Sequence, residues 1–219
     1  MTLSSPSPPL RTDQRLPAPA GAWAYDLWGR HGRPLVLIPA ILFDRLMWWP
    51  AAADLRPYAT VVAVDLPGHG ESPARARYDP DELVDDLAEL VAGLGGTRAP
   101  VVVGHGASAA LALRFAARYA SHAVVTVDAP DDCRRPVPRE EYLARMRLDT
   151  LPECYRDLVR PAADPGLLAA YGSCVDLEAP PAAPGTARLD VRSTDYGVPG
   201  RFAHLTAASR FVGALGALL

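Results

Sequence analysis

The sequence predicts an α/β fold in which a mostly parallel sheet is covered by helices on both faces. Short apolar runs of buried-strand length recur between residues 22 and 127, and helical patterns or turns separate them. The 219 residues suit one domain with a substantial core. A hydrophobic share of 49% with 21% charged residues is ordinary for a globular chain, so disorder is not expected.

The strands are expected where apolar residues follow one another without interruption, because strands of a covered parallel sheet are buried on both faces. An early antiparallel strand is expected at residues 22–29, and the parallel strands at 34–38, 60–64, 100–103, 123–127 and 187–191. A short helix is expected at 44–55, an Ala-rich helix from 109 to about 119, and a last helix at 203–218.

The clearest helix boundary in the sequence lies at residue 80. Asp79 is a natural N-cap, and Pro80 fits the first helical position. Leucine and valine then recur at helical spacing until the pair Gly95-Gly96, which favours termination. The pattern therefore predicts an amphipathic helix between these signals.

The strand rhythm disappears between residues 130 and 184, where short helices are expected at 139–148, 151–159 and 165–171. We interpret 131–184 as a cap inserted into a single domain that spans residues 21–219. Residues 1–20 are rich in Pro and Ser, which indicates a mobile N-terminal tail or an arm laid over the surface.

Composition excludes several classes of function. The net charge is −3 and no basic run is present, so no nucleic-acid partner is expected. All 22 basic residues are arginine, so no lysine can form a Schiff base. Cys133, Cys154 and Cys174 lack metal-ligand spacing, which favours a reducing compartment. Without an apolar run of membrane length or a signal peptide, we expect a cytoplasmic protein with no membrane contact, no metal and no cofactor.

Four segments resemble motifs of the α/β-hydrolase family, and they follow one another along the chain in the order usual for that family. They are Gly104-His-Gly-Ala-Ser108, Leu35 to Trp48, Val64-Asp-Leu-Pro-Gly-His-Gly-Glu-Ser72 and Pro199-Gly-Arg-Phe-Ala-His-Leu205. They are similar, in turn, to the nucleophile elbow, the oxyanion loop, the "DLPGHGxS" loop and the terminal "GHFxHL". The resemblance implies the α/β-hydrolase fold: a doubly wound, mostly parallel sheet, shortened in its C-terminal half, with a small helical cap.

The departures from these motifs affect the expected catalytic residues. The family places its nucleophile at the third residue of GxSxG, which here is Gly106, and its histidine where this chain has Arg201. Pro39-Ala40 replaces the usual His-Gly of the oxyanion loop. Asp128 and Asp195 are both candidates for the acid. We therefore take Arg201, Asp128 and Asp195 as catalytic candidates, with Arg201 meeting either an aspartate or a carboxylate or enolate oxygen of a ligand.

The resemblance also indicates the residues that would line the pocket. Ser108 is interpreted as a tolerated small residue, and His69 and His105 as structural. Tyr142 and Met146 lie one helical turn apart in the cap, and His204 is a candidate replacement base. The expected substrate-binding residues are Ile41, Leu42, Phe43, Trp48, Gly106, Ala107, Tyr142, Met146, Tyr196 and His204.

These residues lead to one functional hypothesis and two alternatives. The hypothesis is a cofactor-independent cyclase, which folds a small apolar or polyketide-like substrate for a [4+2]-type ring formation or rearrangement. The chain resembles, in fold and in its lost triad, triad-less cyclases of bacterial polyketide pathways such as that of tetronasin assembly. The alternatives are a non-catalytic ligand-binding pseudoenzyme and a weak esterase that uses Ser108 with His204. The sequence is compatible with a homodimer.

Overall fold

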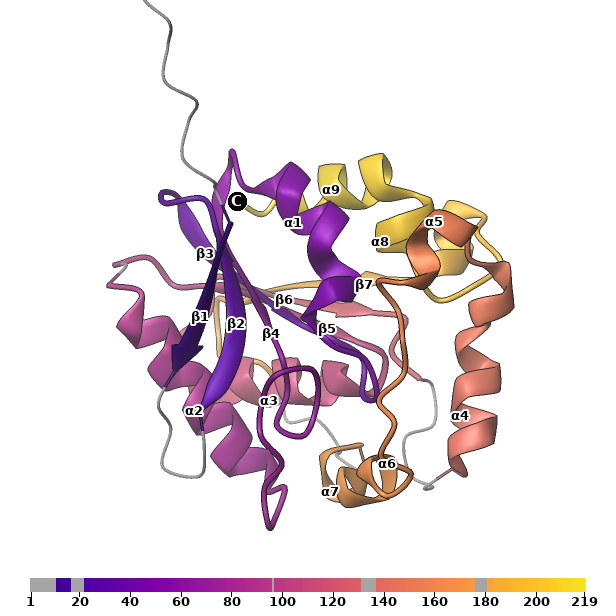
Figure 1. The fold of residues 1–219 in the computed structure, drawn as a ribbon. Coiled ribbons are helices and arrows are strands. Elements are labelled where there is room, and N and C mark those ends of the chain that lie inside the picture. Colours follow the sequence, from indigo (N-terminus) through magenta and orange to yellow (C-terminus); the bar gives the residue numbers. More distant parts are fainter. Residues whose placement is uncertain (1–10, 17–21, 96, 131–136, 176–180) are drawn as a thin grey trace, which may run out of the picture.

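A seven-stranded sheet runs through the part of the chain that the computed structural model describes, residues 11–16, 22–95, 97–130, 137–175 and 181–219. The strand order is β1-β2-β4-β3-β5-β6-β7 (Figure 1). β2 pairs antiparallel with both β1 and β4, and the remaining pairs are parallel. The bounds are β1 Arg11–Leu16, β2 Trp23–Trp28, β3 Arg33–Ile38, β4 Ala59–Val64, β5 Val101–His105, β6 Ala123–Val127 and β7 Ala187–Val191.

Helices cover both faces of this sheet, which confirms the predicted fold class (Figure 1). α2 and α3 lie on one face, and α1, α8 and α9 lie on the other. Their bounds are α1 Trp49–Leu55, α2 Pro80–Gly93, α3 Ala109–Arg118, α8 Ala203–Thr206 and α9 Ala208–Gly216. The central strands β3, β5 and β6 are therefore buried along almost their whole length, as the unbroken apolar runs predict.

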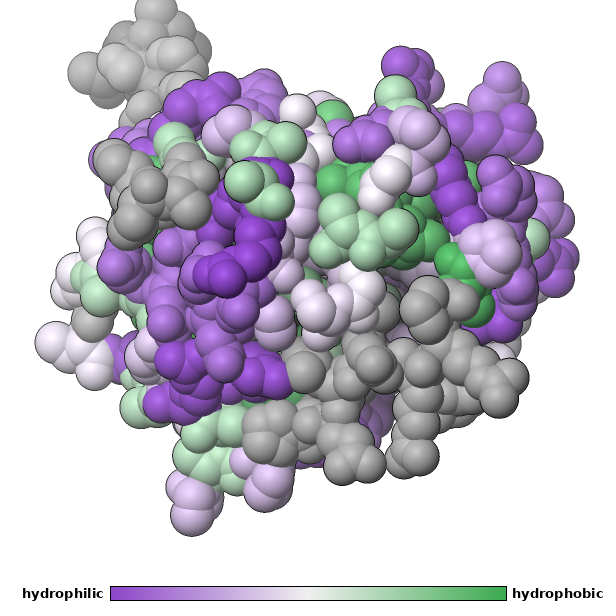
Figure 2. Space-filling model, turned by 90° about the horizontal axis from the view of Figure 1, so that it is seen from below, coloured by the Kyte–Doolittle hydropathy of each residue, from purple (hydrophilic) through white to green (hydrophobic). Residues whose placement is uncertain are grey.

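The cap consists of short helices on one side of the sheet. They are α4 Arg139–Met146, α5 Glu153–Arg156, α6 Leu167–Ala170 and α7 Gly172–Val175, with the 3₁₀ turn η3 at Leu148–Thr150. Residues 131–136 and 176–180 of the predicted insertion lie outside the described residues. From below, a hydrophobic area of the surface borders hydrophilic residues on the side that holds α4 (Figure 2).

Several expected boundaries differ from the structure. Residues 11–16, assigned to the N-terminal tail, form edge strand β1 against β2, while residues 1–10 and 17–21 lie outside the described part. The helix expected at 151–159 is reduced to the four residues of α5. The last helix is divided at Ala207, whose backbone angles of φ −130° and ψ 39° interrupt α8 and α9.

The helix boundary predicted at residue 80 is confirmed. Pro80 is the first residue of α2, and the Asp79 carboxylate accepts hydrogen bonds from the backbone N–H groups of Asp81 (2.9 Å) and Glu82 (3.3 Å). These bonds satisfy two donors that have no partner within the helix. α2 thus begins where the sequence indicates.

Candidate functional site

Gly106 lies in a tight turn between β5 and α3, at the start of the 3₁₀ turn η2 (Gly106–Ser108). Its φ is +57°, in the left-handed region that glycine adopts without strain. Gly104 makes the turn sterically possible, because a Cβ there would lie 2.5 Å from the Ser108 carbonyl oxygen. A Cβ at Gly106 would lie 3.5 Å from the Ala40 Cβ and 3.7 Å from the Tyr142 hydroxyl. The turn therefore has the strand–turn–helix shape of a nucleophile elbow, with room for a side chain.

The loop after β3 is held by a buried histidine. Leu42 has a φ of +76°, and its backbone N–H donates to His69 Nε2 (2.9 Å). His69 Nδ1 donates to the Pro67 carbonyl oxygen (3.1 Å), which fixes the neutral tautomer. Burial lowers the pKa of His69 to about 4, so this acceptor persists at neutral pH. In this kind of fold, an N–H of this loop and the N–H of the residue after the elbow, here Ala107, form the oxyanion hole.

The same loop is connected to the cap and to a core of aromatic rings. The Leu42 carbonyl oxygen accepts a hydrogen bond from the Ala162 N–H (2.7 Å), a residue of the cap. Phe43 contacts Phe202 edge to face, with ring centroids 5.8 Å apart. Ile41, Leu42 and Phe43 are buried, so the predicted apolar wall is part of the packed core beside the elbow.

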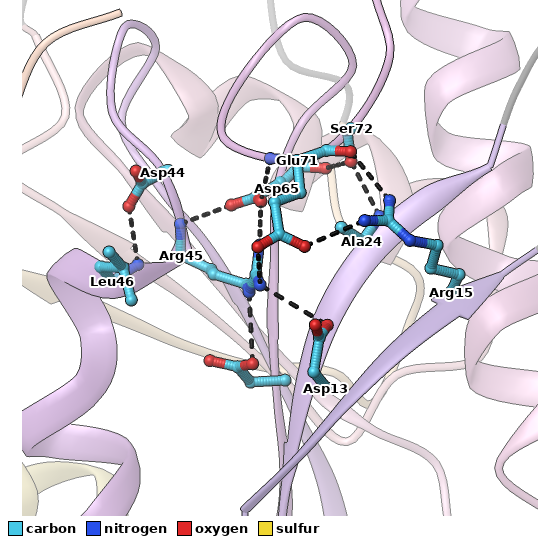
Figure 3. Close-up of polar contacts among 10 residues, drawn as sticks. Asp13, Arg15, Ala24, Asp44, Arg45, Leu46, Asp65, Glu71 and Ser72 are labelled. Carbon is cyan, nitrogen blue, oxygen red and sulfur yellow. Dashed lines mark hydrogen bonds and ion pairs between the residues drawn. The ribbon is translucent and has the colours of Figure 1, made fainter.

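A network of charges centred on the buried Arg45 lies next to this loop (Figure 3). Arg45 follows the loop in the 3₁₀ turn η1 (Arg45–Trp48), and its backbone N–H donates to the Asp65 carboxylate (2.7 Å). The Arg45 guanidinium forms ion pairs with Asp65, Asp26 (3.2 Å), Glu71 (3.4 Å) and Asp13 (3.5 Å). Burial raises the pKa of Asp65 to about 6. This network, which the sequence analysis missed, joins β1, β2 and the loops after β3 and β4.

Of the two candidate acids, Asp128 lies beside Arg201. Asp128 follows β6, and its carboxylate accepts hydrogen bonds from the N–H (2.8 Å) and the hydroxyl (2.6 Å) of Ser193. Arg201 Nη1 donates to the Asp128 carbonyl oxygen (3.0 Å), not to the carboxylate. Asp195 is exposed, and its carboxylate accepts the Arg192 N–H in the local turn η4 (Ser193–Tyr196). Asp195 therefore stabilises its own turn, and within the described part of the chain it forms neither a hydrogen bond nor an ion pair with Arg201.

Tyr142 extends from α4 toward the elbow. Its hydroxyl oxygen is buried and has no hydrogen-bond partner in the part of the chain that the structure describes. The same atom faces the Cβ position of Gly106. Burial raises the pKa of Tyr142, and the positive charge of Arg201 acts in the opposite direction. Met146, one turn further along α4, is also buried. Tyr142 thus lies against the elbow at Gly106, and the charge of Arg201 reaches it. That these residues line a pocket stays a prediction.

His204 and Trp48 belong to a buried aromatic cluster. The His204 ring lies 4.4 Å from Trp48, 5.2 Å from His105 and 5.9 Å from Phe211, measured between ring centroids. His105 Nε2 donates to the Arg201 carbonyl oxygen (2.6 Å). Burial lowers the pKa values of both histidines, and His105 lowers that of His204 further. The Ser108 hydroxyl has no hydrogen-bond partner within the described ranges, so Ser108 and His204 are not hydrogen-bonded to each other.

Trp48 and Tyr196, two of the predicted substrate-binding residues, contact other parts of the protein instead of the elbow at Gly106. Trp48 is fully buried in the aromatic cluster, which explains its conformation through packing alone. Tyr196 lies under the guanidinium of Arg210, 5.0 Å from the ring centroid, and its carbonyl oxygen accepts a bond from the same arginine. We therefore correct both assignments: Trp48 is a core residue, and Tyr196 is held by an arginine of α9.

A mixed sheet with a tight strand–turn–helix elbow after β5 and a helical cap beside it is the arrangement of an α/β-hydrolase fold. The chain belongs to the alpha/beta hydrolase family, whose sequence profile matches residues 35–217. Among solved structures, the enol-lactonase from Burkholderia xenovorans LB400 is 17% identical, with a TM-score of 0.73 over 94% of this chain and 99% of that one. A thermophilic esterase from Thermogutta terrifontis is 18% identical, with a TM-score of 0.64 over 94% and 96%. These likenesses show the fold.

A curated relative matches a shorter region. The dihydrolipoyllysine-residue acetyltransferase component of the acetoin cleaving system of Pseudomonas putida is 37% identical over 93 residues. That region is 42% of this chain, and it spans 25% of the length of the relative. Among the described helices, none combines the length and the hydrophobicity needed to cross a bilayer.

Proposed function

We propose that the protein is an enzyme of the hydrolase fold that works without a covalent acyl intermediate, as a cofactor-independent cyclase or isomerase. The observation that carries this proposal is that Gly106 occupies the nucleophile position of the elbow and Arg201 the position of the usual histidine. Glycine offers no nucleophilic atom at the elbow, and guanidinium does not accept a proton near neutral pH. Acyl transfer needs both a nucleophile and a base.

The remaining groups suit the shaping of an apolar substrate. Tyr142 offers a hydroxyl donor, Arg201 offers a positive charge, and the backbone at Ala107 lies at an oxyanion position. Oriented donors of this kind polarise a carbonyl that is conjugated to the reacting bonds. Holding the two ends of a flexible chain together removes much of the entropic barrier to ring closure. A linear polyketide-like substrate with a conjugated carbonyl fits this description.

Hydrolysis is the second candidate, because the chain belongs to a family of hydrolases. It would require Ser108 as nucleophile with His204 as base. Ser108 is buried, the two side chains are not hydrogen-bonded to each other, and the pKa of His204 is lowered well below its ordinary value. These observations favour the first proposal over hydrolysis.

Incubation with a fluorophosphonate probe, followed by intact mass, tests the choice between the two. We expect no adduct on the wild-type protein while a serine hydrolase labels in the same experiment. An adduct that disappears in Ser108→Ala would overturn the proposal in favour of hydrolysis.

A second measurement separates a cyclase from a ligand-binding pseudoenzyme. Ring closure changes the retention of a linear polyene substrate on chromatography and leaves its mass unchanged. Saturable binding without such conversion would assign the protein to the non-catalytic class.

A further inference from the structure

We infer that Arg201 and Tyr142 form a binding site for a delocalised oxygen anion of the ligand, a carboxylate or an enolate. The inference rests on the proposed function in that it assigns the ligand to the same site beside Gly106. It names the chemical class of the substrate, which the proposed reaction type leaves open.

The guanidinium of Arg201 has more donors than the protein satisfies. It is half-buried and donates from Nη1 to the Asp128 carbonyl oxygen, and among the described residues no carboxylate lies within ion-pair distance of it. By contrast, the buried arginines Arg45 and Arg75 each form an ion pair with an aspartate. An anion at this point would supply a counter-charge and accept the N–H donors of Arg201 that the described residues leave free.

The hydroxyl of Tyr142 supplies a second donor at the elbow, and it lies near enough to Arg201 for the positive charge to affect its pKa. It is buried and has no hydrogen-bond partner among the described residues, an arrangement that costs free energy until a ligand accepts the bond. It lies 3.7 Å from where a Cβ of Gly106 would be, and that position is 3.5 Å from the Ala40 Cβ. The hydroxyl therefore points at the elbow, where glycine and alanine place no larger side chain against it.

The combination favours an anion whose charge is shared by two oxygens. Guanidinium presents parallel donors that match the two oxygens of a carboxylate, and an enolate of a 1,3-dicarbonyl compound offers a similar pair. A neutral ester would accept the tyrosine bond but would leave the arginine charge uncompensated.

Isothermal titration calorimetry on the full chain at pH 7.5 tests the site with three probes. Octanoate carries a carboxylate, 2-octanoyl-1,3-cyclohexanedione carries an enolate, and octanamide is uncharged. We expect saturable binding of at least one anion, weakened about tenfold or more in Arg201→Gln, since a charge-assisted bidentate contact is lost. Tyr142→Phe should weaken the same anion by a smaller factor, and octanamide should bind weakly and equally to all variants.

Arg210→Gln is the matched control, because Arg210 is an exposed arginine of α9 that contacts Tyr196. Its affinity for the anion should equal that of the wild type. No saturable binding of either anion would overturn the inference, and so would equal anion affinities of the wild type, Arg201→Gln and Tyr142→Phe. The two anion arms show which source of charge the site prefers. Labelling of Ser108 by the fluorophosphonate probe, with anion binding intact, would refute the proposed reaction class and leave the anion site standing.

Discussion

At the scale of single residues, Gly106 decides which chemistry the elbow performs. We predict that Gly106→Ser folds but does not hydrolyse p-nitrophenyl butyrate, because Arg201 cannot accept the serine proton. The double variant Gly106→Ser with Arg201→His should hydrolyse this ester roughly 10²-fold faster than the single variant, the contribution of a positioned base. Gly106→Ala with Arg201→His is the matched control and should stay inactive. Ester cleavage by Gly106→Ser alone would contradict the argument.

Asp128 is held by Ser193 rather than by Arg201, and this has a consequence for stability. Ser193→Ala removes the hydroxyl that donates to the buried carboxylate at 2.6 Å. We expect the free energy of unfolding to fall by about 2 kcal/mol, the scale of a hydrogen bond to a charged group. Urea denaturation at pH 7.5 measures it. Ser209→Ala, at an exposed serine of α9, should change the free energy by less than about 0.5 kcal/mol.

Sequence reasoning placed candidate residues near the elbow but could not show all of their contacts. The motifs placed Gly106, Arg201 and Asp128 at the ends of neighbouring elements, where the fold brings them together. Nothing in a local pattern could show that Ser193 occupies the Asp128 carboxylate, because these residues come from separate strands. Trp48 was misjudged because an aromatic residue beside an oxyanion loop looks the same in sequence whether it faces a pocket or the core.

At the scale of elements, the capping of α2 gives a clean test. Asp79→Ala removes an acceptor of two backbone N–H groups at the start of the helix. The free energy of unfolding should fall by about 1 kcal/mol, the usual cost of losing an N-cap. Thermal or urea unfolding measures the difference. Glu89→Ala, at an exposed position of α2, is the control, and an equal loss in both variants would contradict a capping role.

Agreement with the predicted bounds does not simply follow burial, because β6 is buried throughout whereas β7 is mostly exposed. β6 and β7 have the expected bounds, and α2 begins at its cap. β1 was assigned to a tail because its sequence, RTDQRL, is polar and shows no apolar alternation. It is an edge strand, and its charged residues Asp13 and Arg15 form ion pairs with Arg45 and Glu71. Long-range ion pairs of this kind leave no periodic signal.

At the scale of the whole molecule, the buried histidines make stability depend on pH. The pKa of His69 falls from 6.5 to about 4, and those of His105 and His204 also fall. Below pH 6.5 the unfolded chain binds protons that the folded chain does not, so these groups lower stability as the pH decreases. Asp65, with its pKa raised from 3.8 to about 6, and Asp44, also raised, act in the opposite direction. Three histidines against two aspartates predict a net loss of stability between pH 7 and pH 5.

His204→Phe tests this account, because phenylalanine fits among the aromatic rings and does not titrate. The loss of unfolding free energy between pH 7 and pH 5 should shrink by about 2 kcal/mol, the linkage value for one histidine with a strongly lowered pKa. Urea denaturation at both pH values measures it. His31→Gln, at an exposed histidine, should leave the difference unchanged. An unchanged pH dependence in His204→Phe would show that this imidazole does not contribute.

The left-handed backbone at Gly106 also bears on how this chain can change under mutation. Any other residue at a φ of +57° starts with a steric penalty of about 1–2 kcal/mol, whether or not it brings a useful side chain. A serine there adds hydrolytic activity only if a base is also present at position 201. Neither substitution alone therefore offers an advantage. Selection for stability alone therefore retains the glycine, and a serine nucleophile would have to arise through a single variant that is less stable and gains no activity.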